Sequence, residues 1–249
     1  MPSGYRILPV IYDRWQHSYG KDYSGLILPR LLQTVRQFGI PRSTMVDIAC
    51  GTGSLALMMA RRGWKVWGID ASEGMIRVAS TKVGHRKRQM TFLRQNMQGL
   101  DLPETVMLAT SMFDSINHLL SLSDLADTFR AVYSALRPGG YLIFDTNNEQ
   151  CFATLWTRND VIQHRDFTLI VKCSYNPGAR IGTARVELFE KEGDVYIRRE
   201  ERVRERCFTR EEVSRRLEHA GFHVRVSEDF NFSPVDNIGL IKTWWVAQR

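Results

Sequence analysis

Short apolar runs alternate with amphipathic stretches along residues 45–145, and this rhythm predicts the secondary structure of that region. The runs are short enough for buried strands, and the stretches between them carry apolar residues at helical spacing. Strands that alternate with helices form a parallel sheet with helices on both faces. The predicted strands are Met45–Ile48, Lys65–Asp70, Thr91–Gln95, Val106–Thr110 and Tyr141–Asp145, and the predicted helices lie at about 54–62, 73–83 and 123–136.

The pattern changes at about residue 165, where long stretches become alternating and rich in β-forming residues. Such alternation is typical of antiparallel strands with one buried face. The predicted strands are Phe167–Tyr175, Arg180–Glu190 and Val195–Phe208, separated by turns at Asn176-Pro177-Gly178 and Glu192-Gly193-Asp194. We therefore assign residues 150–207 to an antiparallel β insert that covers a substrate cleft, and residues 1–149 and 208–249 to the main domain.

After the insert, Thr209 and Glu212 form a capping box that starts a helix, and Gly221 ends it. Two strands at about 222–227 and 242–248 then complete the main sheet. A turn at Arg137-Pro138-Gly139-Gly140 leads into the fifth strand, and the first 40 residues have the pattern of an amphipathic helix. The predicted fold class is α/β, with a Rossmann-like, mostly parallel sheet of seven strands, helices on both faces and an inserted antiparallel β subdomain.

Composition fits an ordinary globular protein of 249 residues, with 43% apolar and 24% charged residues. The chain has no apolar run of the ~18 residues that span a membrane and no apolar signal core at its start, so a cytoplasmic protein without membrane contact is expected. Four widely spaced cysteines suggest neither zinc nor a disulfide framework. The net charge of +7 is spread out, and Arg198–Arg206 interleaves arginine with glutamate as on an exposed strand face. We therefore expect no nucleic-acid partner.

The stretch from Val46 to Gly53 predicts a strand, a tight glycine turn and the start of a helix. Gly51 and Gly53 also fit the loose dinucleotide pattern with Asp70 as its acid, so an NAD-dependent oxidoreductase is an alternative. However, Asp47 stands close to where a pyrophosphate would bind and would repel it. A ligand that presents a cation there and ribose hydroxyls to Asp70 fits better, and S-adenosylmethionine has both.

These segments resemble the class I S-adenosylmethionine-dependent methyltransferases. VDIACGTGSLA is similar to their first motif, WGIDAS to their second-strand acid, RQNMQGLDLP to their adenine-edge segment and LRPGGYLIFD to the turn into strand five. Within this class the chain is most similar to small-molecule N-methyltransferases with a β insert after strand five, including amino-sugar N,N-dimethyltransferases. IYDRWQHSYGKDYSG is like their N-terminal Tyr-Asp segment, and SMFDSINHLL is like their strand-four loop that ends in a histidine.

The resemblance implies S-adenosylmethionine as cofactor and assigns residues to its parts. Different residues are implied to contact its methionine end, its ribose and its adenine, and to line the pocket after strand four. Two departures are Asn96, where relatives often have Asp, and Glu104-Thr105-Val106, which lacks the usual Asp-Leu. The implied cofactor-binding residues are Tyr23, Asp47, Ala49, Gly51, Gly53, Asp70, Ala71, Met75, Asn96, Met97 and Met112.

The resemblance also implies a methyl acceptor and two residues beside it. His118 and Tyr12 are the candidates that contact the acceptor or take its proton, because an amine must be neutral before it attacks the methyl group. The expected reaction is in-line methyl transfer to a small molecule at an amine nitrogen, by a monomer or homodimer, and no metal site is expected. A nucleic-acid methyltransferase and a regulatory module without catalysis are alternatives. Ser111-Met112-Phe113-Asp114 stands where base-amino enzymes carry an Asn/Asp-Pro-Pro-aromatic run.

Overall fold

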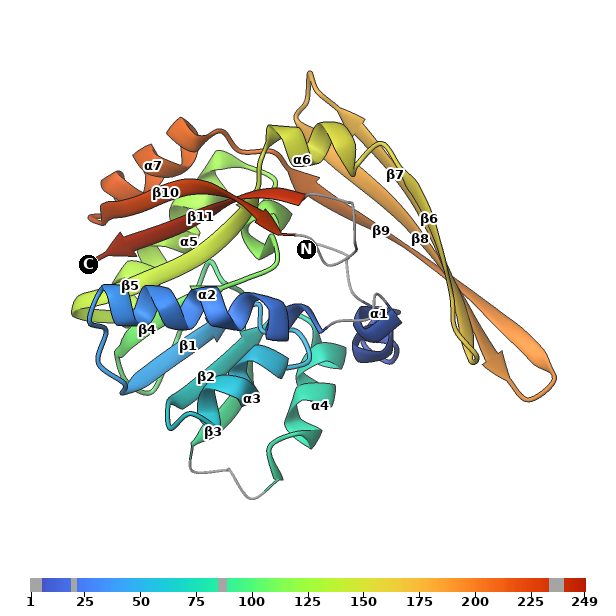
Figure 1. Cartoon of the computed structure of the whole chain (residues 1–249), viewed down its shortest axis with the longest axis horizontal. Helices are drawn as coiled ribbons and strands as arrows, with labels where there is room; N and C mark the ends of the chain where they lie inside the picture. Colours follow the sequence, from blue (N-terminus) through green and yellow to red (C-terminus); the bar gives the residue numbers. More distant parts are fainter. Residues whose placement is uncertain (1–5, 19–21, 85–88, 233–239) are drawn as a thin grey trace.

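A computed structural model of the chain describes residues 6–18, 22–84, 89–232 and 240–249. Its main sheet has seven strands in the order β10-β11-β5-β4-β1-β2-β3 (Figure 1). The strands are β1 Thr44–Ile48, β2 Lys65–Asp70, β3 Met90–Arg94, β4 Val106–Ser111, β5 Leu136–Asn147, β10 His223–Phe232 and β11 Leu240–Gln248.

The direction of the strands confirms the predicted α/β class. β1 pairs in parallel with β2 and β4, β2 with β3, and β4 with β5. β11 runs antiparallel to both β5 and β10, so β10 points the same way as the parallel strands. The carboxyl ends of β1 to β5 therefore meet at one edge of the sheet.

The fifth strand differs from the prediction at its start. Leu136 already pairs with Val106, and the next paired residues are Tyr141 and Leu108, so Arg137–Gly140 form a bulge within β5. Gly139 has φ +77°, which an L side chain rarely adopts. The predicted turn is thus part of the strand, because the chain pairs with β4 on both sides of it.

Helices cover both faces of the main sheet, as predicted. Buried residues of α2 and α3 pack on one face, and those of α5 and α7 pack on the other. The predicted capping box between Thr209 and Glu212 is present at the start of α7. The helices of this part are α2 Tyr23–Gln37, α3 Ser54–Ala60, α4 Glu73–Thr81, η2 Ser115–His118, α5 Leu122–Ala135 and α7 Arg210–His219.

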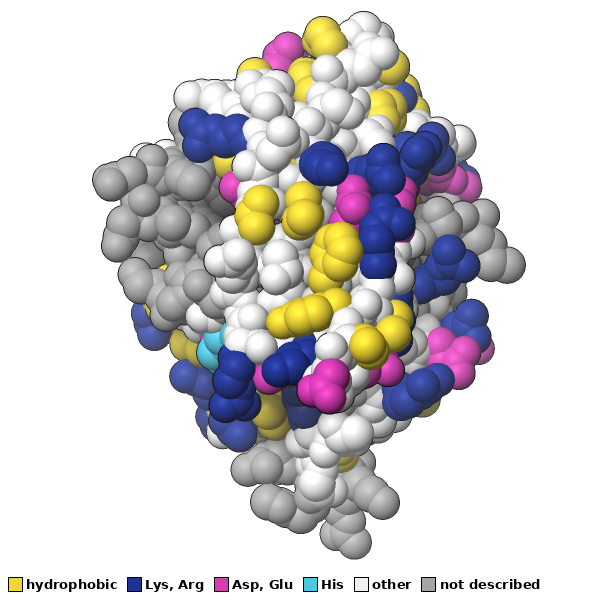
Figure 2. Space-filling model, turned by 90° about the vertical axis from the view of Figure 1, so that its right-hand side faces the viewer, with side chains coloured by type: hydrophobic (Ala, Val, Ile, Leu, Met, Phe, Trp, Pro, Cys, Tyr) yellow, Lys and Arg dark blue, Asp and Glu magenta, His cyan; other side chains and the backbone are white. Residues whose placement is uncertain are grey.

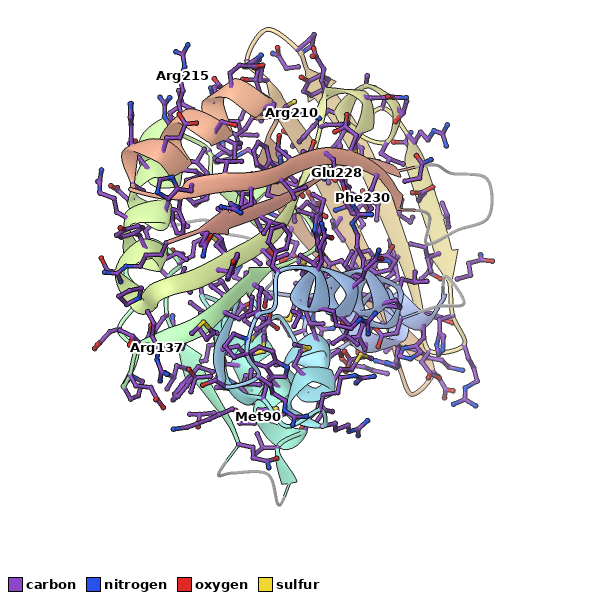
Figure 3. The ribbon with its side chains drawn as sticks, turned by 60° about the vertical axis from the view of Figure 1, so that its left-hand side comes forward. Met90, Arg137, Arg210, Arg215, Glu228 and Phe230 are labelled. Atoms are coloured by element: carbon purple, nitrogen blue, oxygen red, sulfur yellow. The ribbon has the colours of Figure 1, made fainter. Side chains whose placement is uncertain are left out.

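Arg30 of α2 connects this helix to the edge strand β10. Its guanidinium forms an ion pair of 2.6 Å with Glu228 and lies over the ring of Phe230, with 4.5 Å between the guanidinium carbon and the ring centroid. Figure 3 labels Glu228 and Phe230 on this strand. On β11, Trp244 and Trp245 are both buried, on opposite faces of the sheet. The last strands are thus anchored by aromatic side chains, in agreement with an apolar final strand.

The insert is an antiparallel sheet in the order β6-β7-β8-β9 that extends to one side of the main sheet (Figure 1). Its strands are β6 Asn159–Gln163, β7 Phe167–Asn176, β8 Ile181–Glu192 and β9 Val195–Arg206, and α6 Glu149–Thr154 precedes them. The sequence pattern did not predict β6, because Ile162 is the buried residue of an otherwise exposed strand. It did not predict α6 either, which is shorter than two turns.

The outer face of the insert carries the arginines that the sequence predicted to be exposed. Basic, acidic and hydrophobic side chains are mixed on this side of the molecule (Figure 2). Arg198 contacts Glu187 and Glu200 there. Glu201 and Glu205 instead point inward and are 4% and 3% exposed, so the expectation of a wholly exposed Arg-Glu segment is wrong at these two positions.

The first described residues join the two sheets. Leu8 and Ile11 belong to the apolar core of the insert, and the backbone N–H groups of Arg6 and Ile7 donate to the Glu201 carboxylate. α1 (Tyr12–Ser18) follows and lies between the insert and the main sheet (Figure 1). Within the described part of the chain, every helix is too short or too polar to traverse a lipid bilayer.

Gly53 provides a test of the packing below the glycine turn. Its φ is +77°, and an added Cβ would lie 2.4 Å from Cζ of Phe92. We expect Gly53→Ala to lower the free energy of unfolding by about 2–4 kcal/mol, since it combines backbone strain with a clash. Gly99 has no heavy atom within 4 Å of an added Cβ, so Gly99→Ala is the control. Equal urea midpoints for the two variants would contradict this account.

Candidate active site

A cavity of about 660 Å³ lies at the carboxyl ends of β1, β2, β3 and β4. In open α/β sheets this edge is where ligands bind. α1 and β9 close the cavity from the side of the insert. Most of the residues that the sequence predicted for the site line it: Tyr12, Asp47, Ala49, Gly51, Asp70, Ala71, Met75, Asn96, Met97, Met112 and His118.

Two predicted site residues lie behind the cavity wall. Tyr23 begins α2, and its ring packs against Phe113, which does line the cavity. The N–H of Gly53 donates to the Cys50 carbonyl at 2.9 Å, and an added Cβ would point at Phe92. Neither residue is therefore placed to contact a ligand in the cavity; Tyr23 supports an aromatic wall and Gly53 permits close packing of the turn.

The sequence did not identify the other lining residues. Several are neighbours of predicted ones, so the motif indicated their region, whereas Arg202, Val203 and Arg204 come from β9 and carry no local signal. The lining residues that were missed are Gln16, Ser24, Cys50, Thr52, Ser54, Leu55, Ser72, Gln95, Gln98, Phe113, Ser115, Leu119, Leu120, Asp124, Arg202, Val203 and Arg204.

Asp70 fixes the glycine turn from the end of the neighbouring strand. Its Oδ2 accepts a hydrogen bond from the Gly51 N–H at 2.9 Å, and its Oδ1 accepts one from the Ser72 N–H at 2.8 Å. Burial raises the pKa of this carboxyl, although both hydrogen bonds oppose the shift. Ala49, with φ +54°, and Gly51, with φ +55°, adopt the left-handed conformation in this turn. The turn is therefore held in a strained shape that exposes it to the cavity.

Asp47 is the second carboxyl beside the glycine turn, at the same end of the cavity as Asp70. It is 2% exposed and accepts a hydrogen bond from Thr110 Oγ1 at 2.8 Å. Burial and the nearby charge of Asp70 together raise its pKa to about 7, against the effect of the Thr110 hydrogen bond. A ligand cation beside Asp47 would favour the ionised carboxylate and lower this pKa.

Tyr12 places an aromatic ring over the glycine turn. A Cβ added to Gly51 would lie 3.8 Å from Tyr12 Cε1. The helix that carries Tyr12 is tied down by Asp13, which accepts from Thr52 Oγ1 at 2.5 Å and pairs with Lys82 at 2.6 Å. Burial, together with the charges of Asp114 and Asp70, raises the pKa of Tyr12, so its phenol stays protonated at neutral pH.

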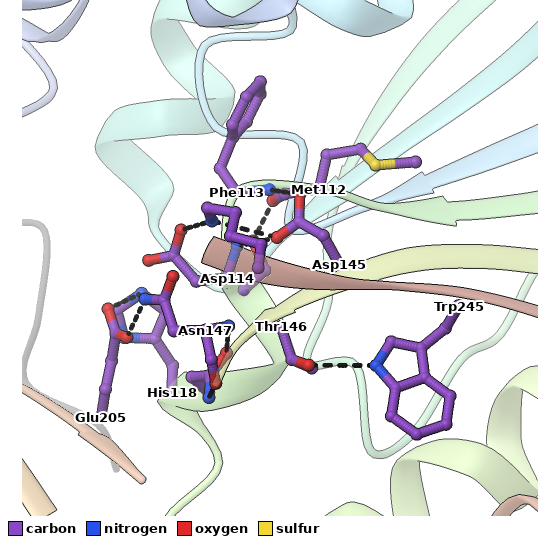
Figure 4. Close-up of polar contacts among 12 residues, drawn as sticks. Met112, Phe113, Asp114, His118, Asp145, Thr146, Asn147, Glu205 and Trp245 are labelled. Atoms are coloured by element: carbon purple, nitrogen blue, oxygen red, sulfur yellow. Dashed lines mark hydrogen bonds and ion pairs between the residues drawn. The ribbon is translucent and has the colours of Figure 1, made fainter. Parts of the chain in front are cut away.

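The loop after β4 is strained, and the buried side chains of Asp145 and Lys242 hold it in place (Figure 4). Phe113 and Asp114 have φ of +62° and +54°, and their N–H groups donate to Asp145 at 3.0 and 2.6 Å. Lys242 Nζ lies 2.5 Å from Asp114 and 3.2 Å from Asp145. Although burial acts in the opposite direction, the two carboxylates raise the pKa of Lys242, so the ammonium stays charged.

His118 ends η2 at the cavity wall. Its side chain is 21% exposed, and its Nε2 lies 3.7 Å from Oε1 of Glu205. Burial lowers the pKa of His118, although Asp114 opposes this shift, so the imidazole is neutral at pH 7. The preceding residue, Asn117, donates to the carbonyl oxygens of Asn147 and Arg206 and accepts from the Asn147 N–H. β5 and β9 thereby fix the position of η2.

The cavity thus has two chemically different ends. The end at the glycine turn offers two carboxylates and a strained backbone, with Met75, Met97 and Met112 as apolar wall. The other end offers the neutral imidazole of His118, beside β9. This arrangement can hold a cationic nucleoside at the first end and a proton-bearing nucleophile at the second.

Comparison with known proteins agrees with this geometry. Residues 45–140 match the methyltransferase domain family. YqeM of Bacillus subtilis strain 168, provisionally named a methyltransferase, is 29% identical over 194 residues, which are 76% of this chain and 77% of the relative. The dTDP-3-amino-3,4,6-trideoxy-alpha-D-glucopyranose N,N-dimethyltransferase of Streptomyces venezuelae is 25% identical over 167 residues, 67% of this chain and 68% of the relative.

The fold is shared over nearly the whole chain. The crystal structure of an S-adenosylmethionine-dependent methyltransferase from Clostridium acetobutylicum superposes with a TM-score of 0.80 and 20% sequence identity, covering 95% of this chain and 98% of the other. The seven-stranded sheet, the glycine turn between Asp47 and Asp70 and the family match agree: residues 45–140 match a methyltransferase domain, and the chain has the fold of S-adenosylmethionine-dependent methyltransferases.

Proposed function

We propose that the chain transfers a methyl group from S-adenosylmethionine to an amine nitrogen of a small molecule. The observation that carries this proposal is a neutral, cavity-lining histidine, His118, in the same cavity as the carboxylates Asp47 and Asp70. An amine acceptor needs a proton acceptor of this kind. A relative that acts on an amino sugar supports the choice of nitrogen.

The residues at the glycine turn fit the cofactor. Asp47 would pair with its α-ammonium group, Ala49 and Gly51 would approach the methionine end, and Asp70 would accept from the ribose hydroxyls. Asn96 and Met97 would flank the adenine, with Ala71 and Met75 beside the adenosine and Met112 in the pocket after β4. Asp47 supports this fit. A ligand cation would stabilise the ionised form of this buried carboxyl, whose pKa is about 7. When bound, S-adenosylmethionine supplies an electrophilic methyl group.

The acceptor would bind between His118, Tyr12 and the insert. His118 takes or orients the amine proton, so that the nitrogen lone pair is free. Tyr12, whose phenol is protonated, can donate a hydrogen bond to the acceptor. The protein otherwise provides proximity, with the reacting atoms held ~3–3.5 Å apart and in line.

The insert, residues 150–207, would select the acceptor. Arg202 and Arg204 of β9 line the cavity and are exposed, and no described carboxylate pairs with either. Three other arginines of the same strand, Arg198, Arg199 and Arg206, each pair with a glutamate. Arg202 and Arg204 are therefore the candidates on this strand for binding an anionic group that the acceptor carries besides its amine.

The function is tested with one matched pair of acceptors. We would incubate the protein and S-adenosylmethionine with dTDP-3-amino-3,4,6-trideoxyglucose or with dTDP-glucose, and measure methyl addition by mass spectrometry. We expect addition to the amino sugar alone. Addition to the hydroxyl compound alone would show O-transfer and overturn the assignment to nitrogen, and heat of binding with NAD but not with S-adenosylmethionine would overturn the enzyme class.

Cofactor affinity should depend on pH through Asp47. The cofactor's ammonium pairs with the ionised carboxylate, whereas the protonated form predominates below the pKa of about 7. Affinity for S-adenosylhomocysteine should therefore fall by up to about tenfold per pH unit as the pH falls below 7. Calorimetry between pH ~5.5 and ~7.5 measures this slope. Asp47→Asn should bind more weakly with a flatter slope; an equal slope in parent and variant would assign the titration to another group.

His118 and Asp70 should affect different steps. We expect His118→Ala to lower the turnover rate about tenfold or more while cofactor affinity changes little, because proton transfer typically contributes ~10²–10⁴-fold. Asp70→Ala should weaken cofactor binding first, since the variant loses the ribose contact and the Gly51 N–H acceptor. Turnover and calorimetric affinity, measured on both folded variants, separate the two roles. A His118→Ala enzyme as fast as the parent would make the histidine structural.

A further inference from the structure

Glu205 projects from β9 into a buried cluster directly behind His118 (Figure 4). The side chain is 3% exposed, its Oε2 accepts from Asn147 Nδ2 at 3.0 Å, and its Oε1 lies 3.7 Å from His118 Nε2. Its carboxyl lies beside that of Asp114, and burial together with the charge of Asp114 raises the pKa of Glu205. One ligand atom each of Asp114, His118 and Glu205 lie within 4.8 Å of one another.

Two neighbouring buried carboxyl groups disfavour double ionisation, so one of them retains a proton. Asp114 is the ionised partner, because Lys242 Nζ lies 2.5 Å from its Oδ1. Although burial acts against it, this ammonium lowers the pKa of Asp114, while burial and the charge of Asp114 raise the pKa of Glu205 well above its usual range. Glu205 therefore carries the proton.

The charges around the cluster also favour one retained proton. Asp145 is the third carboxyl group, and Lys242 is the cation between it and Asp114. Cys151 of α6 and Cys173 of β7 also face Glu205, and burial raises the pKa of both thiols, so they stay neutral. With Glu205 protonated the cluster holds two carboxylates and one ammonium; with Glu205 ionised it would hold three carboxylates against one.

We propose that the proton held by the buried Glu205 controls the basicity of His118; this inference rests on the proposed role of His118 as proton acceptor. While Glu205 is protonated, the neighbour of the imidazole is neutral and the imidazole stays unprotonated. When His118 binds the proton of the acceptor amine, the neutral Glu205 does not stabilise the imidazolium. His118, which lines the cavity, then releases that proton to solvent, so one proton is released per methyl transferred.

A metal ion is a competing interpretation of the same residues. One histidine and two carboxyls at this spacing resemble a ligand set, but Lys242 already stands at Asp114. A divalent ion would bring a second positive charge beside the ammonium in a buried place. We therefore assign the cluster to a proton retained on Glu205.

The test is an NMR titration of the His118 ring in the S-adenosylhomocysteine complex, with no acceptor present. We expect two inflections, one from His118 and one from Glu205, separated by about one pH unit or more. Glu205→Gln should leave one inflection, because the amide can still accept the hydrogen bond from Asn147 but cannot titrate. Glu205→Asp, which restores a carboxyl, should bring the second inflection back.

Glu201→Gln is the matched control. Glu201 lies on the same face of β9 and is equally buried, but it accepts from the N–H groups of Arg6 and Ile7. This variant should titrate like the parent. A single inflection in the parent, a second inflection that persists in Glu205→Gln, or a titration altered by Zn²⁺ and restored by EDTA would each overturn the proposal. Because no methyl transfer is measured, its failure is distinct from failure of the proposed function.

Discussion

The buried ammonium of Lys242, between Asp114 and Asp145, is the interaction on which the acceptor side of this protein depends. It joins the loop after β4 and the ends of β5 and β11. The loop would not keep its shape by itself, because two consecutive non-glycine residues are left-handed there, which costs about 1–3 kcal/mol each. Asp145 holds the loop by accepting both N–H groups, and Lys242 compensates the charge of Asp145. Removing one member of such a buried group generally costs about 3–5 kcal/mol, because a charge is left without its partner. The strain and the ion pair thus maintain each other, and together they hold Phe113 and His118 at the cavity.

The cofactor side follows a different physical logic. Here Asp70 holds the strained turn through backbone N–H groups, and Asp47 is buried near a second carboxyl. Burial raises the pKa of both carboxyls, so the site by itself disfavours its own negative charge. A ligand that brings a cation removes this disadvantage, and part of its affinity comes from that relief. On the acceptor side, a lysine of the protein therefore compensates the charge of the carboxylates. On the cofactor side, a cation of the ligand would compensate it.

The sequence was informative where structure is local. The strands, the glycine turn, the capping box at Thr209 and eleven of the thirteen proposed site residues in the cavity wall followed from short-range patterns, because periodicity and turn residues reflect the conformation of their own segment. The missed features are long-range or lack a pattern. Lys242 contacts residues 128 and 97 positions away, and Glu205 contacts Asn147 across 58 positions, so no local motif marks them. Glu205 also lies in the segment of alternating arginine and glutamate that was predicted to be exposed. β6 has too few apolar residues to show a period. Asp145 illustrates the same limit, because only the fold shows that its partner is a lysine.

The strand β9 explains how the insert would take part in the proposed chemistry as well as cover the cleft. One face of this strand turns to solvent with its arginines, and the other face delivers Glu201, Val203 and Glu205 to the interior. Glu201 holds the chain just before α1, which carries Tyr12, and Glu205 reaches His118, so both proposed acceptor residues are positioned by one strand of the insert. The carbonyl of Arg206 on the same strand binds Asn117, the neighbour of His118. The cofactor end, by contrast, is built from β1 to β4 and their own turns. A change of acceptor specificity through the insert would therefore also change the electrostatic surroundings of His118, because the strand that lines the acceptor space is the strand that supplies its buried carboxyl.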